Sequence, residues 1–164
     1  KFTESVSFDK RLASYDIKGS IAHTQMLAHT GIIKSSIAKK IIKGLKNIGQ
    51  KKIKFSTAIE DAHMNIENAL AKKIGTASQY LHTGRSRNDQ VQLDMRMYVK
   101  DEINTIIYYL KILQKCLLEQ AEKNIDIIIP GFTHMRHAQP VLLAHHLLAY
   151  INMFERNKDR MEEL

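Results

Sequence analysis

A single apolar stripe dominates the second half of the sequence. From Val91 to Ala121, apolar residues recur every three or four positions, which is the period of one face of an α-helix. The stripe consists of Val91, Met95, Val99, Ile103, Ile106, Leu110, Leu113, Leu117 and Ala121. A continuous helix of this kind is roughly 50 Å long, at about 1.5 Å per residue. Further apolar residues at Ile107, Ile112 and Leu118 widen the stripe beyond a two-stranded seam, so the pattern predicts a bundle in which this helix has several neighbours.

Shorter helical patterns precede the stripe. Residues 1–8 show no period and are expected to form a loop, after which Asp9 is expected to cap a short helix over residues 10–16. A second helical segment follows and is expected to close at Gly31, since glycine suits the position just after a helix.

Two further helices are expected before the stripe. One begins at Ser35 or Ser36, carries its apolar residues on one face and ends near Gly49. The next follows the capping-box pattern of residues 57–60 and ends before Gly75.

The segment after the stripe is interrupted by two prolines. Pro130-Gly131 breaks the helical pattern, and Pro140 is expected to be the first residue of a last helix. Residues 125–129 have some strand character. The pattern stops without a helix-ending residue, which indicates a fragment. The sequence therefore predicts an all-α fold, with a helical N-terminal domain over residues 1–85 and the first, truncated part of a long-helix bundle over residues 86–164.

The positive charge is concentrated in one segment. The chain has a formal net charge of +8, and eight of its 25 basic residues, all lysines, lie between Gly31 and Ile59 with no acidic residue among them. The remaining 17 basic residues match the 17 acidic ones. Lysines at helical spacing, without arginine or tryptophan, are typical of a solvated face, so we expect no nucleic-acid partner. The patch remains suited to steering anionic substrates or contacting an acidic surface.

The single cysteine and the hydropathy pattern bear on the compartment. Cys116 excludes an intrachain disulfide, is expected to be a small buried hydrophobe, and fits a reducing, cytoplasmic setting. No stretch reaches the roughly 18 apolar residues of a membrane span, and no basic-then-apolar leader opens the chain. We therefore expect no membrane partner.

The polar stretch from Thr83 to Val91 lies directly at the head of the stripe. Ser86 suits the N-cap position and Asp89 the third helical position, so Arg87 and Asn88 would be the first two helical residues. Backbone N–H groups, the positive end of the helix dipole and a guanidinium would converge there, which favours an anionic ligand such as a carboxylate or phosphate. An ordinary capped helix start with solvated charges is the alternative.

Two more polar clusters interrupt the helical pattern. Within residues 60–67, His63 lies one helical turn from Glu60 and Glu67, although ordinary pairs on a helix surface explain that spacing as well. Residues 131–140 form a polar loop in which His134 is suited to proton transfer near neutral pH. Thr133, next to it, is suited to holding a carboxylate or the imidazole.

The histidines do not indicate a metal site. His134, His137, His145 and His146 are close in sequence, but no cysteine or paired carboxylate accompanies them, and adjacent histidines point to different sides of a helix. The sequence also lacks a glycine-rich phosphate loop, a nucleophile elbow and a suitable Cys-His pair. We therefore expect no metal, no cofactor and no covalent catalysis.

Taken in order, the clusters resemble the successive signatures of the argininosuccinate lyase family, within the fumarase and aspartase superfamily. The matching stretches are Lys1 to Ser5 with Asp9, Asp16 to Ser20, Glu60 to Glu67, Thr83 to Val91, Thr133-His134, and Ala138 to Pro140. The string Gly84 to Gln90, with its arginines, is the one that separates this family from fumarases and aspartases. The residues Met135 to His137 depart from the family's usual pattern.

The resemblance implies a β-elimination that splits argininosuccinate into arginine and fumarate. Such a reaction needs a base for the β-carbon proton, stabilisation of the charge that develops on the adjacent carboxylate, and an acid for the departing nitrogen. By the same resemblance His134 and His63 are the catalytic candidates, with His134 as the proton-transfer residue. The substrate-binding candidates are Ser5, Asp9, Arg87, Asn88, Thr133 and Gln139.

The resemblance also implies an assembly. Members of the family form homotetramers by stacking their long helices, and each active site collects its signature regions from different subunits. Their second proton-transfer residue is a serine on a later loop that this chain does not contain, so the fragment alone is expected to be inactive. Three alternatives stay open: another lyase of the superfamily, such as adenylosuccinate lyase; a non-catalytic, crystallin-like use of the scaffold; and, for the fragment itself, a plain helical interaction module.

Overall fold

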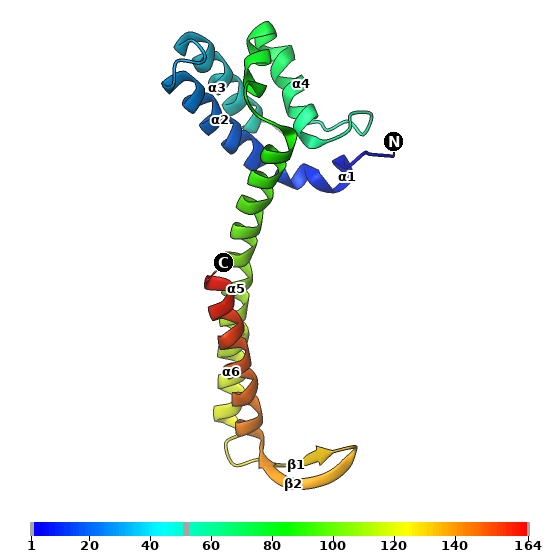
Figure 1. The fold of residues 1–164 in the computed structure, drawn as a ribbon. Helices are drawn as coiled ribbons and strands as arrows, with labels where there is room; N and C mark the ends of the chain where they lie inside the picture. Colours follow the sequence, from blue (N-terminus) through cyan, green and yellow to red (C-terminus); the bar gives the residue numbers. More distant parts are fainter. Residues whose placement is uncertain (1, 51–52, 164) are drawn as a thin grey trace. The chain divides into compact units, whose positions relative to one another are not determined.

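The structure, a computed structural model, describes residues 2–50 and 53–163. It divides between Tyr98 and Val99 into two compact units (Figure 1). This division lies inside the long helix, because the first turns of that helix pack against the N-terminal helices. The domain ranges 1–85 and 86–164 of the whole protein stay a prediction. Among the described residues, none of the helices combines the length and the apolar composition needed to cross a membrane.

The first unit opens with three connected helical elements: α1 (Val6–Asp9), the 3₁₀ turn η1 (Lys10–Leu12) and α2 (Ala13–His29). The expected loop is confirmed over residues 2–5 and wrong over residues 6–8, and residues 10–16 are not a separate helix because they continue through η1 into α2. Asp9 does not cap a helix, because its carboxylate accepts hydrogen bonds from the Ser5 hydroxyl and from the backbone N–H of Ala62. The predicted end of α2 is confirmed, since Gly31 follows it with a φ of +74°.

The next helices differ from their predictions at one boundary. Helix α3 (Ser35–Gly49) lies where it was expected, whereas α4 (Ala62–Ile74) begins later than the pattern of residues 57–60 indicated. Its N-cap is Asp61, whose carboxylate accepts from the Met64 N–H at 2.6 Å. Gly75 ends α4 with a φ of +65° and opens the unpredicted 3₁₀ segment η2 (Gly75–His82), which leads to α5 (Arg87–Lys123).

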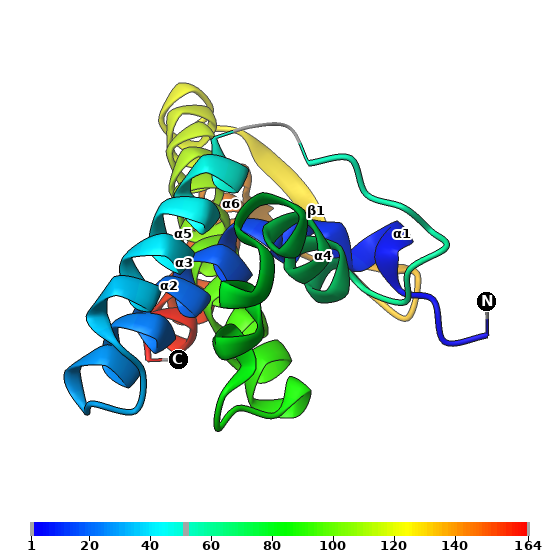
Figure 2. The same ribbon diagram turned by 90° about the horizontal axis from the view of Figure 1, so that it is seen from above.

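The core of the first unit lies between α2, α3, α4 and η2. Figure 2 shows α2 and α3 running side by side. Their inward faces, with those of α4 and η2, bury Ala13, Ile17, Ile41, Leu45, Ile48, Ile66, Leu70 and Leu81. The lysines Lys39, Lys43 and Lys46 are exposed on the outer face of α3, as predicted. Lys51 and Lys52 of the same patch lie outside the described residues.

The second unit adds a hairpin and a helix to the rest of α5. The strands β1 (Ile128–Thr133) and β2 (Arg136–Leu142) pair antiparallel, and α6 (Leu143–Glu162) follows. Pro140 is not a helix start: it pairs with Pro130 inside the hairpin, where each strand is an edge and tolerates proline. Within the unit, α6 lies beside α5, and the Gln114 side chain donates to the Ile151 carbonyl at 3.2 Å (Figure 1).

The stripe of α5 is only partly covered in the described chain. Ile107 and Ala121 are buried, but Val99, Ile106 and Leu113 keep more than two fifths of their surface exposed. Cys116 is exposed as well, so the prediction of a buried thiol is wrong for this chain. The physical reason is that α6 lies along one side of the helix, whereas the prediction assumed several neighbours.

Candidate active site

The polar loop that enters α5 folds as the sequence predicts. The Ser86 N–H donates to Asp89 Oδ2 at 3.0 Å, and the Asn88 N–H donates to Ser86 Oγ at 3.2 Å, which is a reciprocal cap at the N-terminus of the helix. Gly84 has a φ of +65°, a conformation that favours glycine. Asn88 is exposed at this helix start.

One face of α2 holds this loop at three places. Asp16, Ser20 and His23 lie one turn apart along the helix. Asp16 Oδ1 accepts from Gln90 Nε2 at 2.5 Å, and Ser20 Oγ accepts from Arg85 Nη2 at 3.1 Å. His23 Nε2 lies 3.0 Å from the carbonyl oxygen of Thr83. The conformation of residues 83–90 is therefore determined by contacts to α2 as well as by the cap.

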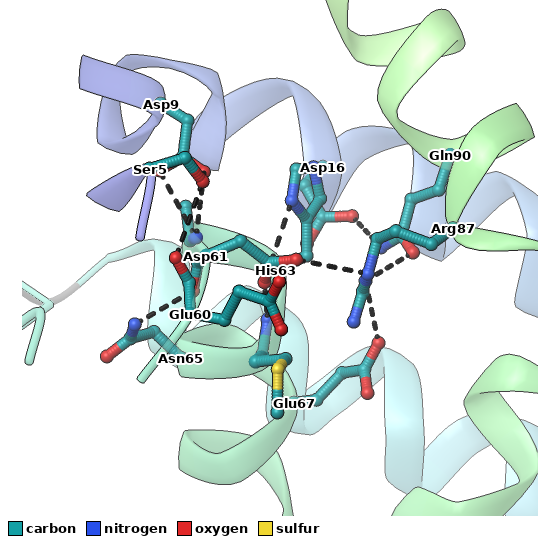
Figure 3. Close-up of polar contacts among 12 residues, drawn as sticks. Ser5, Asp9, Asp16, Glu60, Asp61, His63, Asn65, Glu67, Arg87 and Gln90 are labelled. Atoms are coloured by element: carbon teal, nitrogen blue, oxygen red, sulfur yellow. Dashed lines mark hydrogen bonds and ion pairs between the residues drawn. The ribbon is translucent and has the colours of Figure 1, made fainter. Parts of the chain in front are cut away.

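Arg87 connects the same loop to α4 (Figure 3). Its guanidinium pairs with Asp61 Oδ2 at 3.3 Å and with Glu67 Oε1 at 3.0 Å. It also donates to Gln90 Oε1 at 2.6 Å. Two carboxylates thus already neutralise this cation, which cross-links α4 and the start of α5, and its role in holding a substrate carboxylate stays a prediction.

His63 lies in the buried interior, on the first turn of α4. The residue is 1% exposed, and its Nε2 lies 2.9 Å from Asp94 Oδ2, on α5. Burial by itself lowers the pKa of His63, but the Asp94 hydrogen bond and the nearby carboxylates of Asp16 and Asp61 outweigh it, so the pKa is raised above its ordinary value. The imidazole is therefore a good carrier of positive charge at this point.

A pocket of about 480 Å³ brings three of the predicted site residues together. Ser5, Asp9 and His63 line it, and the Ser5 hydroxyl donates to Asp9 Oδ2 at 2.6 Å. The other lining residues are Phe8, Arg11, Leu12, Asp61, Val91, Met95 and Tyr98. Polar groups thus converge at one side of a largely apolar wall, as in many small-molecule sites.

The remaining predicted residues lie on the hairpin of the second unit. Thr133 ends β1, Gln139 lies in β2, and His134 occupies the turn between the strands. His134 and Met135 have φ values of 49° and 65°, which are uncommon for residues with a side chain and match a two-residue hairpin turn. The turn presents the His134 side chain to solvent. The structure therefore groups the candidates as Ser5, Asp9, His63, Arg87 and Asn88 in one unit, and Thr133, His134 and Gln139 in the other.

The sequence interpretation missed the buried polar residues that support the site. Asp16, Ser20, Gln90 and Asp94 are each at most 2% exposed. A signal was present, because Asp16 and Ser20, like Gln90 and Asp94, are polar residues spaced by four next to an apolar stripe. That spacing places two polar side chains on one helix face, but it does not say that the face is buried.

The buried charges also include a group with the composition of a metal site. One ligand atom each from Asp16, His63 and Asp94 lies within 4.8 Å of the others. Hydrogen bonds already engage them, from Gln90 to Asp16 and between His63 and Asp94. Burial raises the pKa of Asp16, against the lowering effect of the Gln90 hydrogen bond and of His63, and burial lowers the pKa of Arg85. The arrangement is a buried network of two carboxylates, an imidazole and a guanidinium.

Comparison with known proteins places this arrangement in a family. The family model described as "Lyase" matches residues 1–164. The argininosuccinate lyases of Trichlorobacter lovleyi and Geotalea daltonii are 53% and 54% identical over 169 and 167 residues, which cover 99% of this chain. The chain spans 36% of the length of these curated relatives.

Solved structures support the same placement. The EDDS lyase in complex with formate has a TM-score of 0.79 and 27% identity, over 94% of this chain and 31% of that one. The β-carboxy-cis,cis-muconate cycloisomerase of Acinetobacter calcoaceticus, at 23% identity, has the same TM-score and shares the fold. Because the family model matches residues 1–164 of the chain, the chain belongs to the lyase family.

Proposed function

We propose that the protein to which this chain belongs is an argininosuccinate lyase, which eliminates arginine from argininosuccinate and releases fumarate. The observation that carries the proposal is the capped loop of residues 83–90. Three contacts from α2 and the Arg87 pairs hold it at the start of α5. Relatives with that name are about half identical over nearly the whole chain.

In this reaction the C–N bond between the succinyl part and the guanidino nitrogen breaks. A base removes the proton from the neighbouring carbon, the electron pair becomes the C=C bond of fumarate, and an acid returns a proton to the nitrogen of arginine. Negative charge develops on the carboxylate next to the deprotonated carbon, and donors aimed at it lower the barrier.

The candidate residues other than Arg87, whose guanidinium is already paired with Asp61 and Glu67, each have a place in that scheme. The N-terminus of α5 and the Asn88 side chain bind a carboxylate, since the helix dipole favours an anion there and the exposed Asn88 amide can donate a hydrogen bond to it. Ser5 and Asp9 bind other polar parts of the substrate in the pocket, and His63, whose pKa is raised, adds positive charge beside them when it is protonated. Thr133 and Gln139 contribute from the hairpin, where His134 transfers the proton.

The same proposal includes an assembly and a compartment. The exposed apolar side chains of α5, among them Val99, Ile106 and Leu113, supply a surface for further helices. We infer that long helices from four copies stack there, so that hairpin and pocket residues of different subunits share a site. The free thiol of Cys116 suits the reducing cytoplasm.

The experiment that tests the function is a substrate comparison on the full-length protein. We expect fumarate release, followed by its ultraviolet absorbance, from argininosuccinate and not from adenylosuccinate. Release from adenylosuccinate alone would replace the proposal by that of another lyase of the superfamily. A correctly folded full-length protein that releases fumarate from neither compound would indicate a non-catalytic use of the scaffold.

A further inference from the structure

His63 and Asp94 form the most deeply buried charged pair of the site. Both residues are 1% exposed, and Nε2 lies 2.9 Å from Oδ2. They come from different elements, α4 and α5, so the contact depends on how these two helices pack. A carboxylate at this distance accepts a hydrogen bond from Nε2–H in both the neutral and the charged imidazole, and thereby favours the neutral tautomer that carries its proton on Nε2.

The second ring nitrogen of His63 has no such partner among the described residues. Nδ1 is buried and makes no hydrogen bond, and the carboxylate oxygen Asp61 Oδ1 lies 3.9 Å away. A buried ring nitrogen without a hydrogen bond destabilises the fold, so it needs an explanation. His63 and Asp61 both line the pocket with Ser5 and Asp9, and Nδ1 is the ring nitrogen on the Asp61 side.

Three elements contribute the charges that act on the pKa of His63, and Asp9 of α1 and Arg11 of η1 line the same pocket. Asp16 approaches from α2, Asp61 from the start of α4, and Asp94 from α5. Arg85, in the loop before α5, balances part of this negative charge, since it interacts with both Asp16 and Asp94. Among these groups, Asp94 is the one that forms a hydrogen bond with the ring.

We propose that Asp94 is the positioning residue of His63: it keeps a proton on Nε2, orients the ring, and so leaves Nδ1 as the nitrogen directed to the substrate side. The inference rests on the proposed function, because it assigns Asp94 to the site of that reaction. Asp94 itself touches no reacting atom, and it acts through the imidazole.

The test compares Asp94→Asn with Glu102→Gln in the full-length protein. Both variants replace a carboxylate of α5 by an amide, but Glu102 is exposed. Hydrogen–deuterium exchange at the imidazole Cε1–H, followed by mass spectrometry, reports the pKa of His63 whether or not the enzyme turns over. We expect Asp94→Asn to lower that pKa relative to wild type and Glu102→Gln to leave it unchanged.

Activity supplies the second readout. We expect Asp94→Asn to reduce kcat about 10- to 100-fold with little change in KM, the range known for the partners of metal-bound histidines, and to move the acid limb of the pH–rate profile. In the background of His63→Gln, Asp94→Asn should have little further effect on kcat, because the two residues act as one unit.

Several outcomes would overturn the inference. One is an unchanged pKa of His63 in Asp94→Asn. Another is a loss of kcat with an unchanged pH profile, which indicates a merely structural role. If Asp94→Asn does not fold, Asp94→Glu takes its place: it keeps the carboxylate, so it should retain the raised pKa while lowering kcat, and a normal kcat would contradict positioning. An inactive wild type would refute the proposed function alone, because the exchange measurement still tests the pair.

Discussion

At the residue scale, the loop before α5 is held by side chains that are polar and buried at the same time. Gln90, Asp16 and Ser20 hydrogen-bond to one another or to the loop, and none of them is more than 2% exposed. An unpaired polar group in such a place costs roughly 1–3 kcal/mol. Each of these hydrogen bonds therefore raises the free energy of any conformation of residues 83–90 that would break it.

The contact between His23 and the Thr83 carbonyl oxygen also holds this loop, and it is sensitive to pH. Burial lowers the pKa of His23, and the Arg85 guanidinium adds to this, against the hydrogen bond to the Thr83 carbonyl, which raises it. The folded state therefore binds the proton less well than the unfolded state, so the contribution is present above the unfolded pKa and is lost as the pH falls through the folded one.

We therefore expect the wild type to lose stability relative to His23→Gln between about pH 7 and pH 5. The glutamine amide can still donate to the Thr83 carbonyl but does not titrate. The difference should stay below about 1 kcal/mol, because the side chain is partly exposed. Urea unfolding at several pH values measures it, and parallel stability curves for the two proteins would contradict it.

His134 is the residue on which the proposed chemistry depends most. In the full-length enzyme we expect His134→Asn to reduce kcat by roughly two to four orders of magnitude, the effect of a lost acid or base. Asparagine tolerates the positive φ of this turn, so the hairpin should remain intact. His137→Asn, the same change in β2 of the same hairpin, is the control and should keep near-normal turnover. Normal turnover of His134→Asn would remove His134 from its role.

At the scale of elements, the close packing of α3 against α4 decides the geometry of the first unit. Gly44 lies on the buried face of α3, where an added Cβ would meet Leu70 Cδ1 at 2.6 Å and Ile74 Cγ2 at 3.1 Å. Leu70 is itself fully buried, so it has little room to move. A side chain at position 44 would push apart the two helices and shift the start of α4, on which His63 lies.

This contact gives a prediction with a matched control. Gly44→Ala should lower the free energy of unfolding by about 1–2 kcal/mol, because overpacking exceeds the gain in helix propensity. At Gly49, the last residue of α3, an added Cβ meets only ordinary contacts with Ile17 at 3.6 Å and 3.7 Å. Gly49→Ala should therefore be neutral or slightly stabilising. Chemical denaturation compares the two, and equal effects would show that α3 and α4 adjust freely.

The hairpin, like the 3₁₀ segment η2, is an element that the sequence does not predict. The sequence predicts a helix start at Pro140 because proline suits that position, and residues 131–135 show no strand-like alternation. Pairing with a second strand decides the outcome here, since Pro130 and Pro140 face each other across the ladder. Such a pairing joins residues ten positions apart, which a local pattern does not encode.

At the scale of the whole molecule, we expect the chain to contain only part of the proposed active site. It spans 36% of its curated relatives, and the family resemblance assigns the second proton-transfer residue to a later loop. We therefore expect residues 1–164 alone to release no fumarate from argininosuccinate, whereas the full-length protein does so. Both are measured in one assay at equal concentration. Detectable release by the short chain would contradict the assignment of the missing serine loop.

Local patterns were sufficient to predict most of the helices and several of the candidate residues. The period of the stripe predicted α5, the Ser86 cap predicted its first residue, and Gly31 and Gly75 predicted two helix ends, because each depends on neighbours within a few positions. The tertiary structure alone decided which polar residues are buried together. The side chains of Asp16, His63 and Asp94 lie close together only because α2, α4 and α5 pack against one another. The tertiary structure also places the Asp9 carboxylate on the Ala62 N–H at the start of α4, so that Asp9 does not cap a helix of its own. Long-range packing therefore brings together residues that the sequence identifies only one by one.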